Sequence, residues 1–511
     1  MNECDDDEIA TKSFFLGPQA ENGEWFQKLI SELVSSWLVW RKQVFQDGFG
    51  ISADDLANEQ FKKQQQSFRQ AAMDLTKRFE SEIPKFSPRY IGHMFSEISL
   101  PALVGHWVAT LHNPNLIASE SAPVGVQIER EAIAELAAML GFTSSATGHF
   151  TSCGSVANLE AALRVRDQVT SEDREFIVLI PENKHYSWIK AAHVLGVKKN
   201  NLFSVGLDQS GVMSIPSLKK TLAELKRQSR TPAMIVSVLG TTELGNVDPI
   251  DQIQDILDEE YQGRVWHHVD AAYGGFFSSL RNSKENILSE TVMSALRSLN
   301  RVQSATIDPH KLGYVPYACG AFICRDEQHY QTKIFDSPYI QYSSSKDPGL
   351  FTLEGSRSAS GAAATWLTLK TIGTDSGGYG RIIARTIRIR RELEAKLRLS
   401  SSVRLLNNQH TNVLCFTVGR EGESLAKSNE WVQKFYDSHS KTGASFFVSK
   451  TSLALTTYSQ LADTLFREWR PEVDASEVQV IRLALMNPFI QSKEMKLNIL
   501  DEFCREVLTF N

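Results

Sequence analysis

The chain has few cysteines, and no two of them form a C-x-x-C pair. The six are scattered over its 511 residues: Cys4, Cys153, Cys319, Cys324, Cys415 and Cys504. This spacing is typical of reduced thiols in a cytosolic protein and matches neither a disulfide framework nor a zinc site. His267 and His268 are adjacent, so in a strand they point to opposite faces and at most one can serve a site. We therefore expect no metal.

An excess of positive charge is also missing. The 54 lysines and arginines are outnumbered by 60 aspartates and glutamates, which gives a formal net charge of -6. Such a chain has no general attraction for nucleic acid or for an anionic membrane surface. We therefore expect neither of them as a partner.

Long hydrophobic runs are absent as well. The first residues, "MNECDDDEIATK", are acidic and have no apolar core, so we expect neither a signal peptide nor a transit peptide, and a cytoplasmic location. One uncharged run extends over residues 98–119, but it contains two prolines, two histidines and two asparagines. This composition favours a segment that is buried inside the protein or at a protein interface over one that spans a membrane.

Three regions follow one another along the chain. Residues 1–95 carry amphipathic helical patterns, and residues 396–511 mix strand and helix patterns, as in "VQVIRLALMNPF", and suggest a small α+β domain. In residues 96–395 short apolar strands alternate with helices, which argues for an α/β domain with a mainly parallel sheet. The expected strands are 175–180, 202–206, 233–240, 264–270, 303–308 and 320–325, each a buried run. The expected helices between them are 184–196, 215–228 and 249–260.

Polar residues stand where several of these strands end, and open α/β sheets bind ligands beyond the carboxyl ends of their strands. Gly154 and Ser155, in "TSCGSVANLEAALRVRD", precede a helical pattern, where free N–H groups and the helix dipole suit a phosphate. A capped structural helix is the alternative. Thr241 and Thr242 offer hydroxyl groups after another strand, and a capped turn is the alternative there.

An aspartate and a lysine complete this set. Asp270 ends an apolar strand, where its carboxylate could cap the next helix or stay ionised against a cationic heterocycle. Lys311 lies in "TIDPHKLGYVPYACG" among apolar neighbours, so it either extends its ammonium group to solvent or is neutralised chemically. Asp270 and Lys311 are far enough apart in the sequence for a loop, a helix and one further strand to lie between them. If that strand neighbours the one that ends at Asp270, the two side chains lie side by side. Together these groups match pyridoxal phosphate, which has a phosphate, a ring nitrogen and an aldehyde that captures an amine.

The motifs resemble those of the group II pyridoxal-phosphate decarboxylases from about residue 85 to near residue 490. "TSCGSVANLEAAL" is similar to the phosphate motif of that family, "HVDAAYGG" to its aspartate strand and "DPHK" to its lysine motif. "ENKHYSWIKAA", "DSPYI" and "LEGSRS" are most similar to bacterial tyrosine decarboxylases and their relatives. The resemblance implies an aspartate aminotransferase-like (type I) fold, α-decarboxylation of an amino acid and pyridoxal 5'-phosphate as the cofactor.

The resemblance also implies roles for individual residues. Lys311 would form the Schiff base, Asp270 would pair with the ring nitrogen, and His185 would stack on the ring and assist protonation. A surface histidine at a helix start is the alternative for His185. Cys153 departs from the family, which often has Gly or Ala there. The other cofactor contacts implied are Gly154, Ser155, Thr241, Thr242, Ala272, His310 and, across a dimer interface, Ser356.

A tyrosine on a mobile loop protonates the α-carbon in relatives, and without it side reactions such as transamination compete. The segment "FDSPYIQYSSSKDPG" is polar, contains Gly and Pro and follows the last expected strand, as a lid would. Tyr339 aligns best with the family's tyrosine and Tyr342 is second. An ordinary exposed loop tyrosine is the alternative for both.

The expected substrate is an aromatic, tyrosine-like L-amino acid. His93, in "SPRYIGHM", stands where tyrosine decarboxylases have a pocket histidine, and Ser449 lies in a segment similar to one on their substrate side. A structural role for both is the alternative. An acidic amino acid would need a cation in the pocket, which Arg89 or Arg357 could supply. A lyase or aldehyde synthase with the same cofactor would give a carbonyl product instead.

The resemblance implies an oligomer. Members of the family are dimers whose N-terminal helical segment wraps the partner, with active sites at the interface. We therefore expect a homodimer in which residues 1–95 contact the second copy. A small amino acid is the other expected partner.

Overall fold

The structure is a computed structural model of the chain. It describes residues 3–331, 338, 340, 347–406 and 410–510. The two tyrosines predicted as proton donors, Tyr339 and Tyr342, lie outside the described residues.

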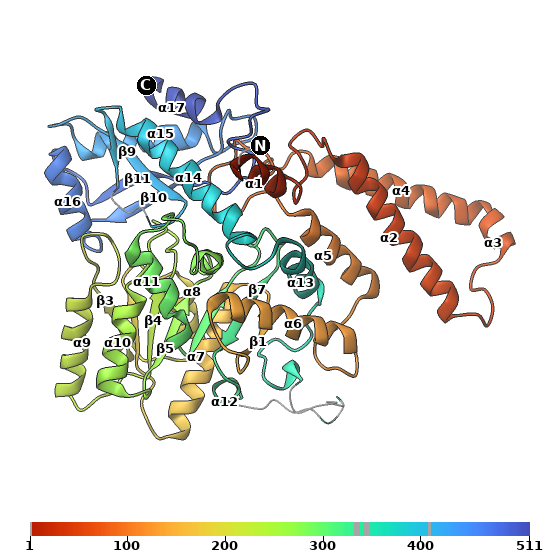
Figure 1. Cartoon of the computed structure of the whole chain (residues 1–511), viewed down its shortest axis with the longest axis horizontal. Coiled ribbons are helices and arrows are strands. Elements are labelled where there is room, and N and C mark those ends of the chain that lie inside the picture. Colours follow the sequence, from red (N-terminus) through yellow and green to blue (C-terminus); the bar gives the residue numbers. More distant parts are fainter. Residues whose placement is uncertain (1–2, 332–337, 339, 341–346, 407–409, 511) are drawn as a thin grey trace.

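A seven-stranded sheet forms the centre of the larger unit, in the order β1-β7-β6-β5-β4-β2-β3 (Figure 1). Its strands are β1 Thr147–Thr151, β2 Val178–Pro181, β3 Leu202–Val205, β4 Met234–Val238, β5 Trp266–Asp270, β6 Ser304–Ile307 and β7 Gly320–Cys324. Strands β3, β2, β4, β5 and β6 pair in parallel, whereas β7 is antiparallel to both of its neighbours. The mainly parallel α/β fold is therefore confirmed.

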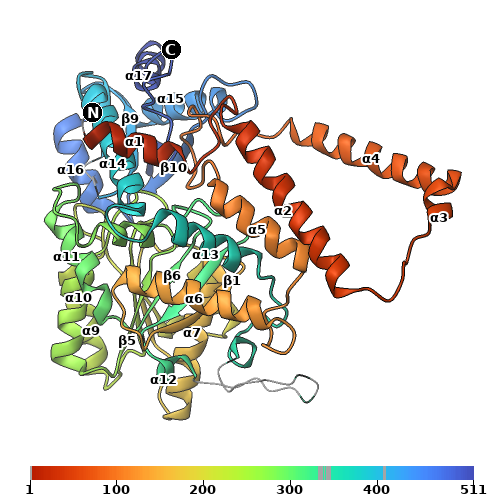
Figure 2. The same ribbon diagram turned by 45° about the vertical axis from the view of Figure 1, so that its right-hand side comes forward.

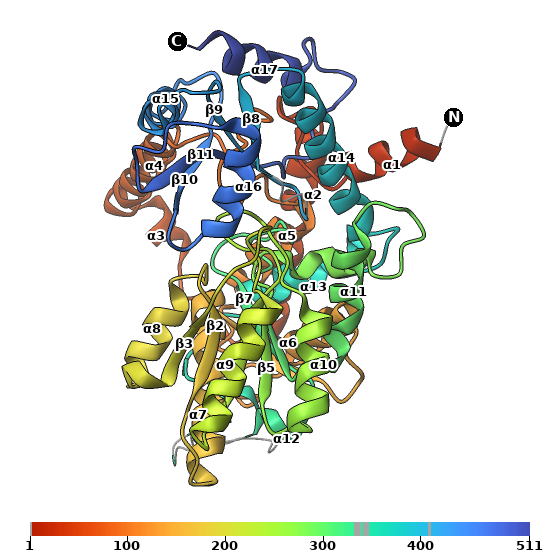
Figure 3. The ribbon, with the colours of Figure 1, turned by 90° about the vertical axis from the view of Figure 1, so that its left-hand side faces the viewer.

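Helices cover both faces of this sheet because alternate residues of its strands point to opposite sides. Ile180 and Val236 pack with α7 (Gly154–Ser171). Leu179 and Ile235 pack with α9 (Ile215–Arg227) and α10 (Ile250–Tyr261), which lie side by side in Figure 3. The expected buried run at 202–206 is an exception, since β3 is an edge strand with an exposed Ser204. The helices of this unit are α5 Leu100–His112, α6 Pro123–Leu140, α7 Gly154–Ser171, α8 Ser187–Val194, α9 Ile215–Arg227, α10 Ile250–Tyr261, α11 Glu290–Ser298, α12 Glu327–Tyr330, α13 Ser360–Ile372 and α14 Tyr379–Arg398.

A second, four-stranded antiparallel sheet has the order β10-β11-β9-β8. Helix α14 joins the two units, since its first half packs in the core of the large sheet and Ile389, Leu393 and Leu397 pack in the core of the small one. The other elements are β8 Val403–Leu405, β9 Val413–Val418, α15 Leu425–Ser438, β10 Ser449–Ala454, α16 Ser459–Trp469, β11 Glu477–Ala484 and α17 Ile499–Thr509.

The N-terminal helices form an arm that projects from the rest of the chain (Figure 2). After α1 (Glu3–Lys12), α2 (Gly23–Val44) runs outward, α3 (Ala53–Ala57) lies near the tip, and α4 (Glu59–Phe79) returns. Neither α2 nor α4 has a buried residue, although both carry large apolar side chains. The uncharged run at 98–119 forms α5 and its flanking turns. No helix in the described part of the chain is long and apolar enough to cross a membrane.

Candidate active site

A pocket of about 220 Å³ lies at the carboxyl ends of the parallel strands. The chain turns that follow β1, β2, β4, β5 and β6 all contribute to its wall, because these strands run in one direction. The predicted cofactor residues on this wall are Gly154, Ser155, His185, Thr241, Thr242, Asp270, Ala272, His310 and Lys311. The pocket therefore gathers residues that are far apart in the sequence.

Asp270 is the last residue of β5 and is 4% exposed. Its Oδ2 atom accepts hydrogen bonds from Asn158 Nδ2 at 2.8 Å and from Trp188 Nε1 at 3.0 Å. The Ala272 N–H donates to Oδ1 at 3.3 Å. These donors fix the direction of the carboxylate. Asn158 and Trp188 were not predicted, although both lie inside the quoted motifs, one helical turn beyond Gly154 and three residues beyond His185 respectively.

Lys311 follows β6, the neighbour of β5, so it shares the pocket with Asp270. Its side chain is 22% exposed, and Nζ lies 3.0 Å from Oδ2 of Asp308. An ammonium group in this position is compensated by a carboxylate and retains an open side toward the pocket. The amine is therefore held where a ligand's aldehyde could reach it.

His185 lies on the turn between β2 and α8. Its Nδ1 atom is 2.9 Å from Ser187 Oγ, and the backbone N–H of Ser187 also donates to it, at 3.3 Å. Burial and the charge of Lys311 lower the pKa of His185, although Asp270 acts in the opposite direction. A neutral imidazole that accepts at Nδ1 carries its proton on Nε2.

The turn at the start of α7 is shaped for an anion. The first N–H groups of a helix have no partner inside it, and the cap residue Cys153 makes no side-chain capping bond. A Cβ atom at Gly154 would lie 2.7 Å from Oδ2 of Asp308, so only glycine leaves this turn open. An anion turn, an oriented carboxylate and an amine are the three groups that pyridoxal phosphate requires, so the residues fit this cofactor.

Two of the residues predicted to contact the cofactor, Thr241 and Ser356, use their hydroxyl groups in hydrogen bonds within the protein. The Thr241 hydroxyl accepts from the N–H of Asn246 at 3.0 Å, within the turn that follows β4. Ser356 is exposed outside the pocket of its own chain, and its hydroxyl accepts from Asn115 Nδ2 at 3.0 Å. Any contact of Ser356 with a cofactor would thus have to be made in another subunit.

Neither His93 nor Ser449 lines the pocket, but Arg482 connects both to its wall. Arg482 lies on β11 and is 7% exposed. Its guanidinium donates to His93 Nδ1 at 3.1 Å and to Ser449 Oγ at 3.0 Å. It also donates to the carbonyl of Thr242 at 2.5 Å. Sequence reasoning missed Arg482, which makes no ion pair with a carboxylate in the described part of the chain.

The two arginines named for an acidic substrate have other positions. Arg357 is buried in an ion pair with Glu129, and Arg89 pairs with Glu502. Neither lines the pocket. Neither is therefore placed to supply the pocket cation that an acidic substrate would need, and each already pairs with a carboxylate.

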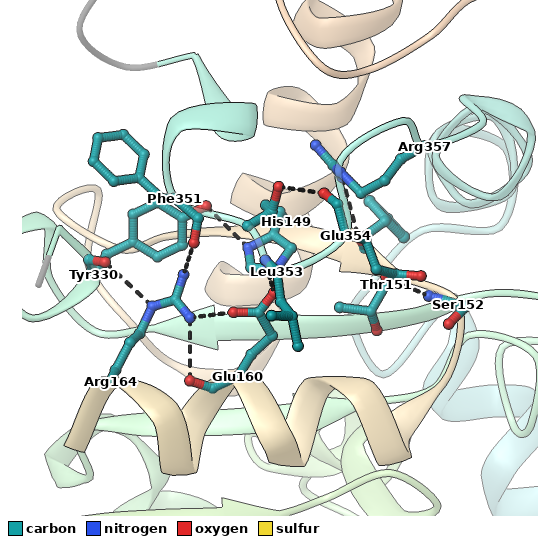
Figure 4. A network of polar contacts seen from close by, with 12 residues as sticks. His149, Thr151, Ser152, Glu160, Arg164, Tyr330, Phe351, Leu353, Glu354 and Arg357 are labelled. Atoms are coloured by element: carbon teal, nitrogen blue, oxygen red, sulfur yellow. Dashed lines mark hydrogen bonds and ion pairs between the residues drawn. The ribbon is translucent and has the colours of Figure 1, made fainter. Parts of the chain in front are cut away.

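A buried polar network holds the chain near Tyr330 and Phe351 against α7 (Figure 4). Arg164 on α7 pairs with Glu160 at 2.5 Å and donates to the carbonyls of Tyr330 at 3.2 Å and Phe351 at 2.7 Å. Glu160 also accepts the N–H of Leu353 at 2.7 Å. Although burial opposes ionisation, Arg164 and His149 lower the pKa of Glu160 to about 2. Helix α7 therefore anchors the chain on both sides of residues 331–350.

Comparisons with known proteins bear on this site. Residues 52–419 match the family described as "Pyridoxal-dependent decarboxylase conserved domain". The L-tyrosine decarboxylase of Levilactobacillus brevis is 27% identical over 95% of this chain and 94% of its own length. The L-2,4-diaminobutyrate decarboxylase of Rhizobium meliloti is 29% identical over 50% of this chain and 49% of its own length. A crystal structure of Catharanthus roseus tryptophan decarboxylase in complex with L-tryptophan has a TM-score of 0.69 at 16% identity and covers 96% of this chain and 98% of that one.

These matches support the fold and the cofactor together. The solved structure shares the architecture, and the family uses the cofactor that the pocket fits. The relatives differ in the amino acid for which they are named, so they do not fix the substrate. Since the match spans residues 52–419, the chain belongs to the pyridoxal-dependent decarboxylases and is a carboxy-lyase that uses pyridoxal phosphate.

Proposed function

We propose that the enzyme removes the α-carboxyl group of an aromatic, tyrosine-like L-amino acid and releases the amine and carbon dioxide. The supporting observation is a series of aromatic rings that leads away from the pocket. His310 on the pocket wall lies 4.2 Å from the ring of Tyr317, which lies 5.9 Å from that of Phe95. Phe95 in turn stacks on His93 at 5.7 Å. A series of rings of this kind suits packing against an aromatic side chain.

His93 is the residue that would recognise a ring hydroxyl. Burial and the nearby guanidinium of Arg482 lower the pKa of His93, so the imidazole is neutral at pH 7. Because Nδ1 accepts from Arg482, the proton of the neutral ring lies on Nε2 and can donate to a hydroxyl oxygen. Arg482 is thus a positioning residue for His93.

The residues of the pocket divide the chemistry among them. When bound, the cofactor's ring supplies an electron sink for the charge that the departing carbon dioxide leaves behind. Asp270 would hold the proton of the ring nitrogen, and the Lys311 amine would hold the aldehyde. His185 would cover one face of the ring, and Ala272, which is small, would leave room on the other. Tyr339, or else Tyr342, would protonate the α-carbon.

A second substrate class has one observation in its favour. Arg482 is a buried cation without a carboxylate partner in the described chain, and a substrate carboxylate could pair with it. All three of its nitrogen atoms nevertheless already donate to His93, Ser449 and Thr242. The arginine is therefore better suited to holding the pocket wall, and the aromatic substrate is preferred.

We also propose a homodimer with shared active sites. The arm of α2 and α4 leaves large apolar side chains exposed, among them Leu38, Trp40, Phe68 and Leu75. Exposed apolar side chains gathered on two helices are typical of protein interfaces. The exposed position of Ser356, outside its own pocket, agrees with a contribution to the partner's site.

The direct test supplies single amino acids to the purified protein with pyridoxal phosphate and measures carbon dioxide and amine. Tyrosine, phenylalanine, tryptophan, glutamate, aspartate and 2,4-diaminobutyrate form the panel. Release of carbon dioxide from tyrosine, with equal amounts of amine, is the expected result. Preference for an acidic or diamino substrate would refute the aromatic assignment, and an aldehyde product would place the enzyme with the aldehyde synthases.

A further inference from the structure

The carboxyl group of Asp308 lies directly against the turn that begins α7. Asp308 is 2% exposed, and a Cβ atom at Gly154 would lie 2.7 Å from its Oδ2 and 2.9 Å from its Oδ1. A Cβ atom at Gly320, on the other side, would lie 2.8 Å from Oδ1. The carboxyl group is therefore a close neighbour of the turn to which we assign the phosphate.

The two oxygen atoms of Asp308 have different surroundings. Oδ2 lies 3.0 Å from Lys311 Nζ and 3.5 Å from His310 Nε2, so Lys311 is its ion-pair partner. Oδ1 is buried and has no hydrogen-bond partner in the described part of the chain. A buried acceptor without a donor is costly, and this one lies between Gly154, which lines the pocket, and Gly320.

Among the residues that the structure describes, the other groups near Asp308 provide no second cation. Burial lowers the pKa of His310, although Asp308 opposes this, and burial also lowers the pKa of His185. Tyr317 and Cys319, the remaining titratable groups that Asp308 influences, have pKa values raised by burial and are neutral at pH 7. Lys311 is thus the cation that balances the carboxylate, and it is also the amine assigned to the aldehyde.

A phosphate ester at the α7 turn would add up to two negative charges beside this carboxylate. Like charges this close are not both retained in a buried site, and one group takes up a proton instead. We propose that Asp308 takes up one proton from solvent at Oδ1 when the cofactor binds, and that the resulting O–H donates a hydrogen bond to a phosphate oxygen. The charge of the carboxyl group changes from one negative to zero, and the oxygen that had no partner becomes a hydrogen-bond donor to the phosphate. This inference rests on the proposed phosphate site.

The test is a calorimetric titration of the full-length chain, freed of cofactor, with pyridoxal phosphate in buffers of different ionisation enthalpy. The wild type should take up about one more proton than Asp308→Asn. Between pH 7 and 8, its dissociation constant should rise about tenfold more than that of the variant. His310→Gln is the matched control and should retain the uptake, because its imidazole is not the acceptor. Equal uptake in the wild type and Asp308→Asn would overturn the proposal.

Pyridoxal, which lacks the phosphate, is a second probe that needs no variant. The wild type should take up about one proton fewer with pyridoxal than with pyridoxal phosphate, and equal uptake would overturn the proposal even if Asp308→Asn did not fold. Gly154→Val tests the site assignment separately. Unchanged affinity of this variant for pyridoxal phosphate would show that the phosphate binds elsewhere, and the proton proposal would then fall with the site.

Discussion

Arg482 on β11 donates a hydrogen bond to His93, which precedes α5, across 3.1 Å. The same guanidinium reaches the carbonyl of Thr242 on the pocket wall. A residue of the small sheet thus fixes a side chain of the N-terminal region against the strand ends of the large sheet. Substrate selection is expected to depend on this junction of three segments.

We expect Arg482→Lys to reduce kcat/KM by about 10- to 100-fold, mainly through KM, because an ammonium group cannot maintain three directed contacts. The cofactor spectrum should be unchanged, since Arg482 does not line the pocket. Steady-state kinetics with the preferred amino acid measure this effect. Arg470→Lys, at an exposed position, is the matched control. A KM equal to that of the wild type would exclude the positioning role.

Lys311→Ala should abolish covalent attachment of the cofactor, because it removes the amine that faces the pocket. Borohydride reduction followed by mass spectrometry should find the label on Lys311 in the wild type and nowhere in the variant. Lys450→Ala serves as the control, since Lys450 lies on β10 with Gln433 as its partner. A label that persists in Lys311→Ala would contradict the assignment of the attachment site.

Asp270→Asn should lower kcat by about 10²–10³-fold, because it removes the charge that opposes the ring nitrogen while its hydrogen-bonding neighbours remain. Cofactor content, measured by absorbance, should decrease much less than activity. Asp258→Asn, which alters an exposed ion pair with Arg301, is the control. If both variants had the same kcat as the wild type, Asp270 would have no electrostatic role.

Charges on the exposed face of α4 should separate the proposed dimer. Phe68→Glu combined with Leu75→Glu places two carboxylates on apolar surface that a partner would bury. Light scattering coupled to size exclusion should give the dimer mass for the wild type and the monomer mass for the variant. Gln66→Glu, also exposed on α4, should remain dimeric. A dimeric double variant would exclude this face as the interface.

Arg164→Met should destabilise the fold by about 3–5 kcal/mol at pH 7, because it leaves Glu160 buried without its cation. The folded-state pKa of Glu160 is lowered to about 2 from 4.5, so its stabilising contribution is complete above pH 4.5 and is lost as the pH falls through 2. The difference between wild type and variant should therefore shrink over this range. Denaturation midpoints at pH 7, 4.5 and 3 measure it.

The partly exposed neighbour Arg166 provides the control for that experiment. Its ion pair with Asp167 is open to solvent on the arginine side, so Arg166→Met should change stability by no more than about 1 kcal/mol. A difference between wild type and Arg164→Met that stayed constant down to pH 3 would argue against Glu160 as the titrating partner.

Strands β2, β4 and β7 could be predicted because each is a mainly apolar, buried run between polar turns. Strand β1 could not, because "TGHFT" has a single large apolar residue, Phe150. Pairing with β7 and the contact of the Phe150 N–H with Glu129 at 2.9 Å specify it as a strand. Both are tertiary contacts that local sequence does not encode.

The same distinction applies to the site. Lys311, Asp270 and Gly154 could be predicted because each follows a strand and has a chemistry that the cofactor needs. Arg482 is in the middle of "VQVIRLALMNPF", where a lone arginine among apolar residues looks like an ordinary charged side chain of a strand. Its partner His93 becomes a neighbour only when the small sheet packs on the large one.

Helix α7 contains the glycine turn, the Asn158 amide that holds Asp270, and the Glu160–Arg164 pair that anchors the chain around residues 331–350. Substitutions on its buried side would disturb several of these functions at once, so selection or design of a new substrate preference has little freedom there. The aromatic residues near His93 and Tyr317 lie on separate segments. A library that varies those segments and leaves α7 intact would change recognition without dismantling the cofactor site.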